Sequence, residues 1–327
     1  MPENQFIYVT YFDSKYVVRG LTMIESVNAY KELRKVKWIV LALDEESYRS
    51  ASEFLTAEDD LIRIEQFDDS ELLSLRESRP YREFCWTIAA CLINYAIKST
   101  GFGGIVTYVD SDCYFFSNPF NFLENELTSH DIVIHPHDFS INREAQEKAF
   151  GKFNVGVIAG VVSKDYRECV SEWRDQVILK CEINEVAGIF GDQKYLDDWP
   201  VKFDSVAVVT NPGYGRAPWN IGQSEVLLTN NGLRIDSREL IFYHFHGFRI
   251  FHVWYKLYFC VPALGYRLGD KILASIYQIY ARKLVQNRSR LQNDVILTQR
   301  FTLSYSTILT LIRSSKLLLK VRTESVE

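Results

Sequence analysis

The feature that most constrains the fold is a strand-like run that ends abruptly in two acids. Residues 105–109 read IVTYV and are followed at once by Asp110, Ser111 and Asp112. A short run of this kind is typical of a strand that is covered on both faces. In open α/β sheets the ligand crevice lies beyond the carboxyl ends of the strands, so we expect both carboxylates to face that crevice.

The surrounding segments alternate between strand and helix patterns. Residues 6–12 and 38–43 are β-branched and aromatic, and helix patterns follow them over 20–30 and 45–55. A third, shorter strand is expected over 61–67. This alternation predicts an open α/β sheet whose first strands are parallel. Further predicted elements are helices over 83–98 and 166–183 and strands over 131–135 and 155–162.

Composition excludes several classes of protein. The 327 residues suffice for one large domain or two ordinary ones, and 47% of them are hydrophobic, which excludes a disordered chain or a disulfide-stapled miniprotein. No uncharged stretch reaches the roughly 18 residues that a membrane-spanning helix needs. The first residues lack the basic segment of a signal peptide, and the six cysteines include no CxxC pair. We therefore expect a cytoplasmic protein, either soluble or peripheral on a membrane.

Charge is distributed unevenly along the chain. From Arg249 to the end there are 13 Lys and Arg against 4 Asp and Glu, whereas the first 248 residues carry 24 basic and 38 acidic ones. We expect two parts, a body over 1–248 and a basic, aromatic-rich, mainly helical region over 249–327. Such a region suits an anionic membrane surface; alternatively, its helices pack on the sheet and their charges face water. Nucleic acid is not expected as a partner, because the strongest basic density lies away from the acidic strand end.

The paired acids indicate a metal site. Asp110 and Asp112 cannot both be buried and ionised without a counter-charge. A divalent cation removes this conflict, and carboxylate oxygens suit Mg²⁺ or Mn²⁺, which would in turn hold a diphosphate. A solvated loop is the alternative for an isolated Asp-x-Asp, and the strand before it favours the metal site.

A second cluster, Tyr243-His244-Phe245-His246-Gly247, lies late in the chain. Its imidazoles can supply a third metal ligand or a phosphate donor, next to a glycine that lets the backbone approach a ligand. The alternative is that only one of the two histidines faces the site.

Three further clusters place amide or acid side chains beside glycine. Asp192 and Gln193 follow Gly191 and are equipped to bind hydroxyl groups, although Asp192 can equally cap a helix. The other two are Phe153-Asn154-Val155-Gly156 and the segment from Asn211 to Asn220, in which Trp219 is a candidate sugar platform. Both can also be ordinary turns.

Taken in order, these clusters resemble the nucleotide-sugar glycosyltransferases of the GT-A fold, and are most similar to glycosyltransferase family 8 and the bacterial surface-polysaccharide transferases allied to it. The resemblance covers roughly residues 5–250. It implies an α/β fold with a Rossmann-like mixed sheet flanked by helices, here with a C-terminal basic helical extension. It further implies that Asp110, Asp112 and His244 bind Mn²⁺ or Mg²⁺, and that Asp192 and Gln193 lie near the anomeric carbon.

The same resemblance implies the donor-binding residues. Asp13 and Tyr16 would frame the nucleobase, and Asn154 would contact the donor sugar. The full implied set comprises Thr10, Asp13, Tyr16, Arg82, Ser111, Asn154, Trp219, Asn220, His246, Gly247 and Arg249.

The sequence departs from the family at several positions. Ile250 occupies the place of the family's lysine three residues after the late glycine, so Arg249 or His246 is expected to contact phosphate instead. Lys194 follows Asp-Gln where an acid is common, and Arg82 is matched only loosely.

These observations predict a metal-dependent glycosyltransferase that moves a hexose from a nucleotide-diphosphate sugar, a UDP-sugar, to a glycan or lipid-linked glycan. The resemblance implies retention at the anomeric carbon and a role in bacterial surface polysaccharide synthesis. A non-catalytic relic of the same fold and a sugar nucleotidylyltransferase are the alternatives. A phosphatase that forms an aspartyl phosphate fits poorly, because Cys113 and Tyr114 follow the second acid where such enzymes have Gly-Thr or Gly-Val.

Overall fold

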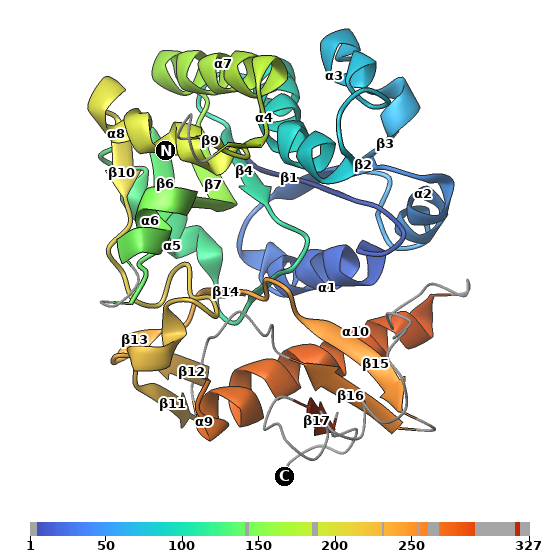
Figure 1. Ribbon diagram of the computed structural model, residues 1–327, viewed down its shortest axis with the longest axis vertical. Coiled ribbons are helices and arrows are strands. Elements are labelled where there is room, and N and C mark those ends of the chain that lie inside the picture. Colours follow the sequence, from blue (N-terminus) through green and yellow to red (C-terminus); the bar gives the residue numbers. More distant parts are fainter. Residues whose placement is uncertain are drawn as a thin grey trace.

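The structure is a computed structural model that describes residues 5–140, 144–184, 189–230, 232–253, 256–260, 268–291 and 318–320. Its centre is a seven-stranded mixed sheet with the order β10-β6-β7-β4-β1-β2-β3 (Figure 1). The strands are β1 Phe6–Phe12, β2 Val36–Ala42, β3 Asp60–Arg63, β4 Ile105–Val109, β6 Ile132–Pro136, β7 Phe153–Val161 and β10 Val206–Val208.

The sheet changes direction at one strand. β1 is parallel to both β2 and β4, and β2 is parallel to β3. β7 runs antiparallel to β4 and to β6, so the sheet is mixed, while β10 and β6 are parallel. All five residues of β4 are buried, as expected for a strand covered on both faces.

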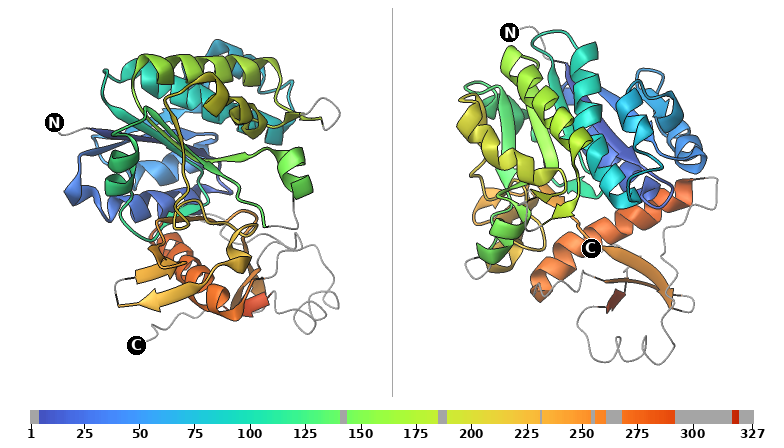
Figure 2. Two further views of the ribbon diagram at one scale, coloured as in Figure 1. Left: turned by 90° about the vertical axis from the view of Figure 1, so that its left-hand side faces the viewer. Right: turned by 45° about the horizontal axis from the view of Figure 1, so that its top comes forward.

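Helices cover both faces of this sheet (Figures 1 and 2). α4 Tyr81–Ser99 and α7 Lys164–Leu179 pack against one face, and α1 Val17–Asn28 packs against the other. Polar caps fix several helix starts, because the side chains of Asp44 and Ser163 accept hydrogen bonds from backbone amides in the first turns of α2 and α7. The remaining helices of the body are α2 Glu45–Ser52, α3 Ser70–Ser74, α5 Pro119–Glu126, α6 Glu144–Phe150 and α8 Trp199–Lys202.

Small sheets lie around the central one. β5 Cys113–Phe115 pairs with β14 Phe242–His244 in antiparallel register. Short 3₁₀ turns occur at Lys31–Leu33, Ile64–Gln66, Gln193–Asp198 and Ile221–Gln223. The other short strands are β8 Ile183–Asn184, β9 Ile189–Phe190, β11 Val226–Thr229, β12 Gly232–Ile235 and β13 Arg238–Glu239.

The described part of the segment after residue 248, predicted to be mainly helical, contains strands as well as helices. It contains β15 Arg249–Val253, β16 Lys256–Cys260 and β17 Leu318–Lys320, which form one antiparallel sheet. The β-branched and aromatic residues of 249–260 favour a hairpin, and the prediction gave weight only to the helical pattern farther along. Helical structure follows as α9 Asp270–Ile272, a π-helical turn at Leu273–Tyr277 and α10 Gln278–Arg290.

This C-terminal segment packs closely on the body. Tyr280 and Leu284 of α10 are buried in the same hydrophobic core as α1. The ring of Tyr280 stacks on Phe245, with centroids 3.8 Å apart. Among the described residues, no helix has the length and apolar character needed to cross a bilayer.

Candidate active site

The carboxyl end of β4 carries the paired acids. Asp110 directly follows β4, and its backbone N–H donates to the carbonyl of Gly156 on β7, 2.8 Å away. Cys113 then donates its N–H to the carbonyl of Asp110, 3.0 Å away, which closes a tight turn between β4 and β5. This turn places the side chains of Asp110 and Asp112 on the same cavity.

His244 reaches the acids through a strand pair between distant parts of the chain. β14 lies antiparallel to β5 with His244 opposite Cys113, and the N–H of Phe245 donates to the carbonyl of Asp112, 2.8 Å away. Alternation along the chain turns Tyr243 and Phe245 toward the core and both His244 and His246 toward the cavity. Both histidines of the late cluster therefore face the site.

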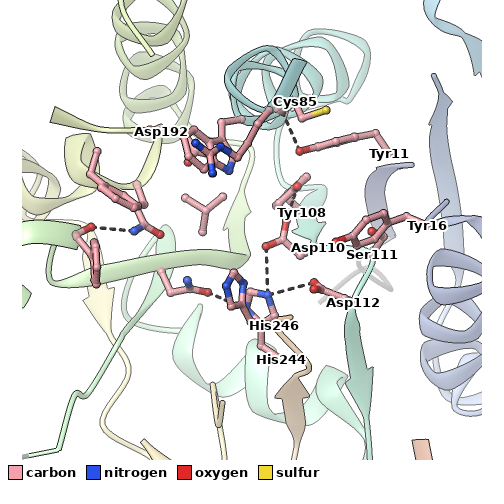
Figure 3. Close-up of a pocket in the computed structure, with 18 of the residues that line it drawn as sticks. Tyr11, Tyr16, Cys85, Tyr108, Asp110, Ser111, Asp112, Asp192, His244 and His246 are labelled. Atoms are coloured by element: carbon pink, nitrogen blue, oxygen red, sulfur yellow. Dashed lines mark hydrogen bonds and ion pairs between the residues drawn. The ribbon is translucent and has the colours of Figure 1, made fainter. Parts of the chain in front are cut away.

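The imidazole of His244 lies between the two carboxylates (Figure 3). Its Nε2 is 3.1 Å from Oδ1 of Asp112 and 3.7 Å from Oδ2 of Asp110. Burial favours the neutral form of each group, yet the His244 charge outweighs it at Asp112 and holds that pKa at about 2. At Asp110 burial prevails and raises the pKa. The two acids thus share one positive partner, and a further cation would favour the ionised form of Asp110.

Asn154 holds His244 in one orientation. Oδ1 of Asn154 accepts the N–H of Gly156, 2.9 Å away, and lies 3.1 Å from Nδ1 of His244. Because Oδ1 is an acceptor, Nδ1 of His244 carries a proton and Nε2 faces the acids. Nε2 is protonated while it pairs with the carboxylates, and it can offer a lone pair to a cation once that proton is lost. The Nδ2 group of Asn154 donates to Nε2 of His137, 3.2 Å away, and Nδ1 of His137 donates to the carbonyl of Gly151. Burial lowers the pKa of His137 to about 3, which is consistent with this acceptor role.

The donor set of Asp110, Asp112 and His244 fits a divalent cation. Nε2 of His244 lies 3.1 Å from one carboxylate and 3.7 Å from the other, whereas neighbouring ligands of one ion are about 3 Å apart at bond lengths of about 2.1 Å. Asp112, His244 and His246 also have ligand atoms that all lie within 4.8 Å of one another.

The cavity in front of these groups has a volume of about 630 Å³. Its charged lining is unbalanced: Asp13, Asp110, Asp112 and Asp192 line it, and Arg82 is the one Lys or Arg among the described lining residues. A diphosphate entering so acidic a cavity requires additional positive charge. The aromatic lining residues are Tyr11, Phe12, Tyr16, Tyr81, Trp86, Tyr108, Phe139, Phe150, Phe190 and Trp219.

Comparison with known proteins bears on the fold. No protein-family model matches the chain. The uncharacterized protein YfnD of Bacillus subtilis (strain 168) is 28% identical over 250 residues, which are 76% of this chain and 79% of YfnD. The uncharacterized protein YfnF of the same organism is 28% identical over 239 residues, 70% of this chain and 78% of YfnF.

Among solved structures, the galactosyltransferase LgtC in complex with donor and acceptor sugar analogs superposes with a TM-score of 0.54, at 14% identity over 88% of this chain and 96% of LgtC. The chain has the fold of a GT-A glycosyltransferase. A crystal structure of an active-site mutant of LgtC gives a TM-score of 0.52 at 13% identity, over the same shares of the two chains. The GT-A fold with a mixed sheet flanked by helices, predicted from the sequence, is confirmed.

In this GT-A chain the acid-amide pair lies on the wall opposite the late histidines. Gly191 has φ +56°, and an added Cβ would lie 2.9 Å from the Trp86 ring, so glycine is needed before Asp192. Burial, reinforced by the Asp110 charge, raises the pKa of Asp192 to about 8. Nε2 of Gln193 donates to the carbonyl of Phe150, 2.8 Å away, which fixes this side chain at the cavity wall.

The predicted nucleobase residues lie at another part of the same cavity. Oδ1 of Asp13 accepts the backbone N–H groups of Lys15 and Tyr16, and the hydroxyl of Tyr81 donates to Oδ2 of Asp13, 2.8 Å away. These contacts order the loop after β1. Arg82 lies over the ring of Trp86, 5.2 Å from its centroid.

Several predicted donor-binding residues do not line the cavity. Thr10 is fully buried within β1, and the side chain of Asn220 is occupied by the carbonyls of His137 and Gly215. Gly247 and Arg249 lie outside the lining, although the Arg249 charge acts on the pKa of Tyr16. Thr10 is therefore part of the core and Asn220 holds the loop around Gly215, and their role in donor contact stays a prediction. Ser111, Asn154, Trp219 and His246 do line the cavity.

The sequence analysis missed several lining residues. Tyr108 donates its hydroxyl to Oδ1 of Asp110, 2.6 Å away, and the hydroxyl of Tyr11 donates to the carbonyl of Cys85. Strand alternation offered a signal for Tyr108, because it lies two residues before Asp110 on the same strand. No local signal identifies His137, which lines the same cavity and accepts a hydrogen bond from Asn154.

Proposed function

We propose that this protein is a metal-dependent glycosyltransferase that moves a hexose from a UDP-sugar to a glycan or lipid-linked glycan, with retention at the anomeric carbon. The observation that carries the proposal is the convergence of Asp110, Asp112 and His244 at the end of β4, on the wall of a large aromatic cavity. A role in bacterial surface polysaccharide synthesis is part of the same proposal, and it rests on the sequence resemblance.

Each part of the cavity has a task in this proposal. A divalent cation bound by Asp110, Asp112 and His244 would neutralise the charge that develops on the departing diphosphate. Asn154 holds the Nε2 atom of His244 toward the acids. Aromatic surface beside Asp13 and Tyr16 suits a planar nucleobase.

In the proposed function, Asp192 and Gln193 contact the donor sugar. The carboxyl of Asp192 is protonated near neutral pH in the cation-free protein, so it can donate as well as accept hydrogen bonds to sugar hydroxyls. Gln193 is anchored by its amide nitrogen at the cavity wall. In the reaction, the bond between the anomeric carbon and the diphosphate oxygen breaks, a bond to the acceptor oxygen forms, and the acceptor proton passes to the departing phosphate.

Titration calorimetry with UDP, with and without Mn²⁺, tests this proposal. We expect UDP binding that needs Mn²⁺ and is weakened at least about tenfold in Asp112→Asn, because that variant loses a charged metal ligand. Asp204→Asn is the matched control, since Asp204 is exposed and lies outside the cavity. Metal-independent UDP binding, or equal binding in the two variants, would contradict the metal role, and a chain that binds neither ligand would be a non-catalytic relic.

Incubation with a panel of nucleotide sugars then separates a transferase from a nucleotidylyltransferase. A transferase releases UDP slowly from its donor when water replaces the acceptor, whereas a nucleotidylyltransferase instead consumes a sugar phosphate and a nucleoside triphosphate. Release of UDP from one sugar of the panel identifies the donor.

Contact with an anionic membrane stays part of the proposal for the C-terminal region. Of the 13 Lys and Arg that motivate it, 5 lie outside the described residues. Among the described basic residues, Arg290 of α10 forms an ion pair with Glu25 of α1, 2.8 Å away. This charge therefore helps to hold α10 against the body. A cytoplasmic location at the inner face of the membrane follows from the same proposal.

A further inference from the structure

His246 is the one imidazole near the predicted metal site whose task the proposed function leaves open. It follows His244 by two residues, and both rings line the cavity. The two rings are 5.9 Å apart at 82°. Trp219 packs against both of them edge to face, at 5.5 Å from His244 and 5.8 Å from His246. One indole therefore supports both imidazoles at the same wall.

The distances around His246 are close to those of a shared ion. Ligand atoms of Asp112, His244 and His246 all lie within 4.8 Å of one another. Ligands on opposite sides of one ion are about 4.2 Å apart at bond lengths of about 2.1 Å. His246 is exposed where it lines the cavity, so core packing does not fix its ring away from a bound ion.

We propose that His246 is a further protein ligand of the cation bound by Asp110, Asp112 and His244, and that it makes the site selective for Mn²⁺ or Co²⁺ over Mg²⁺. This inference rests on the proposed function. Two carboxylates and two imidazoles leave two positions of an octahedral ion for diphosphate oxygens. Imidazole nitrogen favours first-row transition metals, whereas Mg²⁺ prefers oxygen ligands throughout. In this arrangement His246 binds the cation and does not replace the phosphate contact of the family's lysine, whose place Ile250 occupies.

Pulsed electron paramagnetic resonance of the full chain with Mn²⁺ and UDP counts the coordinated imidazole nitrogens. We expect modulation from two nitrogens in the native protein and from one in His246→Ala. The ratio of the Mn²⁺ and Mg²⁺ affinities should fall at least about tenfold in the variant, because even outer-shell changes at metal sites cost about 10–100-fold. His130→Ala, which lies outside the cavity, is the control and should keep both nitrogens.

Two results would overturn the inference while leaving the proposed function intact. One is a single coordinated nitrogen in the native protein, with UDP binding still dependent on Mn²⁺. The other is a His246→Ala variant that keeps its metal preference but binds UDP more weakly to the same degree with every metal, which would assign His246 to phosphate. Absence of both Mn²⁺ and UDP binding in the native protein would overturn the inference and the proposed function together.

Discussion

At the scale of the residue, one amide side chain connects three parts of the site. Asn154 accepts from Gly156 and lies against Nδ1 of His244 through the same oxygen, and it donates to His137 through its nitrogen. The sequence resemblance implies that this residue contacts the donor sugar, and in the structure it also orients His244, the proposed metal ligand.

Replacing Asn154 by leucine should therefore weaken metal binding. Leucine has a similar volume and no acceptor, so His244 loses the bond that fixes its ring, and we expect the Mn²⁺ affinity to fall by about 10–100-fold. Electron paramagnetic resonance of free Mn²⁺ measures this directly, with Asn121→Leu on the exposed surface of α5 as the control. An unchanged Mn²⁺ affinity together with weaker donor binding would contradict this role and indicate that Asn154 contacts the donor sugar.

Asp192 makes the free energy of unfolding depend on pH. The pKa of Asp192 is raised to about 8 from an unfolded value near 3.8. Between these values the folded chain binds more protons at this site than the unfolded chain, so this site makes the free energy of unfolding fall as the pH rises.

Asp192→Asn should remove that dependence. We expect the variant to exceed the native protein by about 1–3 kcal/mol in free energy of unfolding at pH 8, with a smaller difference at pH 5, because its amide carries no charge to desolvate. Urea unfolding without divalent cations at both pH values measures the difference. Asp198→Asn changes an exposed acid near the same turn and should show no such trend. Equal stability of Asp192→Asn and the native protein at pH 8 would contradict the raised pKa.

At the scale of the element, the site depends on a close approach between β7 and β14. A Cβ atom added to Gly156 of β7 would lie 2.6 Å from Oδ1 of Asn154 and 2.8 Å from Nδ1 of His244. Both atoms belong to the hydrogen bond that orients the imidazole, so neither can move without loosening it.

Gly156→Ala should accordingly lower the Mn²⁺ affinity by about tenfold or more, through displacement of His244. Gly101→Ala is the matched control, because an added Cβ there meets no atom within 4 Å. Calorimetric titration of Mn²⁺ in the presence of UDP compares the two variants. Equal affinities would show that β14 tolerates the shift and that its spacing from β7 does not set the metal site.

The same elements show how far sequence reasoning reached. β1 and β4 were predicted with their observed bounds, because each is a continuous run of strand-forming residues. The pairing of β5 with β14 was not predicted, since it joins residues about 130 positions apart through strands of only three residues each. Position along the chain therefore suggested that Asp110, Asp112 and His244 act together, but the contacts of Asn154 and the approach of His246 depend on non-local pairing that no local pattern encodes.

At the scale of the whole molecule, the C-terminal segment packs against the core side of the strand that carries His244. The hydroxyl groups of Tyr277 and Tyr243 are 2.9 Å apart, and Tyr280 stacks on Phe245. Tyr243 and Phe245 flank His244 in sequence, so α10 and the turn before it pack against the segment that carries the two imidazoles proposed to bind metal. The predicted boundary at residue 248 therefore separates two parts of one core.

Tyr280→Ala should lower the free energy of unfolding by about 3–5 kcal/mol, as expected for loss of a fully buried aromatic ring. It should also weaken Mn²⁺-dependent UDP binding, because the strand behind His244 loses its support. Phe102→Ala removes a ring that is 75% exposed and should change neither quantity appreciably. Urea unfolding and calorimetry on the same preparations test both effects, and a variant as stable as the native protein would show that α10 is a dispensable extension.

In the proposed function, the acids after β4 and the late histidine hold the cation that binds the donor diphosphate. Anomalous diffraction at the manganese edge, from crystals grown with Mn²⁺ and UDP, tests it most directly. The expected result is one strong anomalous peak within bonding distance of Asp110, Asp112 and His244, in contact with the diphosphate. UDP bound in the cavity without such a peak, or a peak elsewhere in the molecule, would contradict the claim.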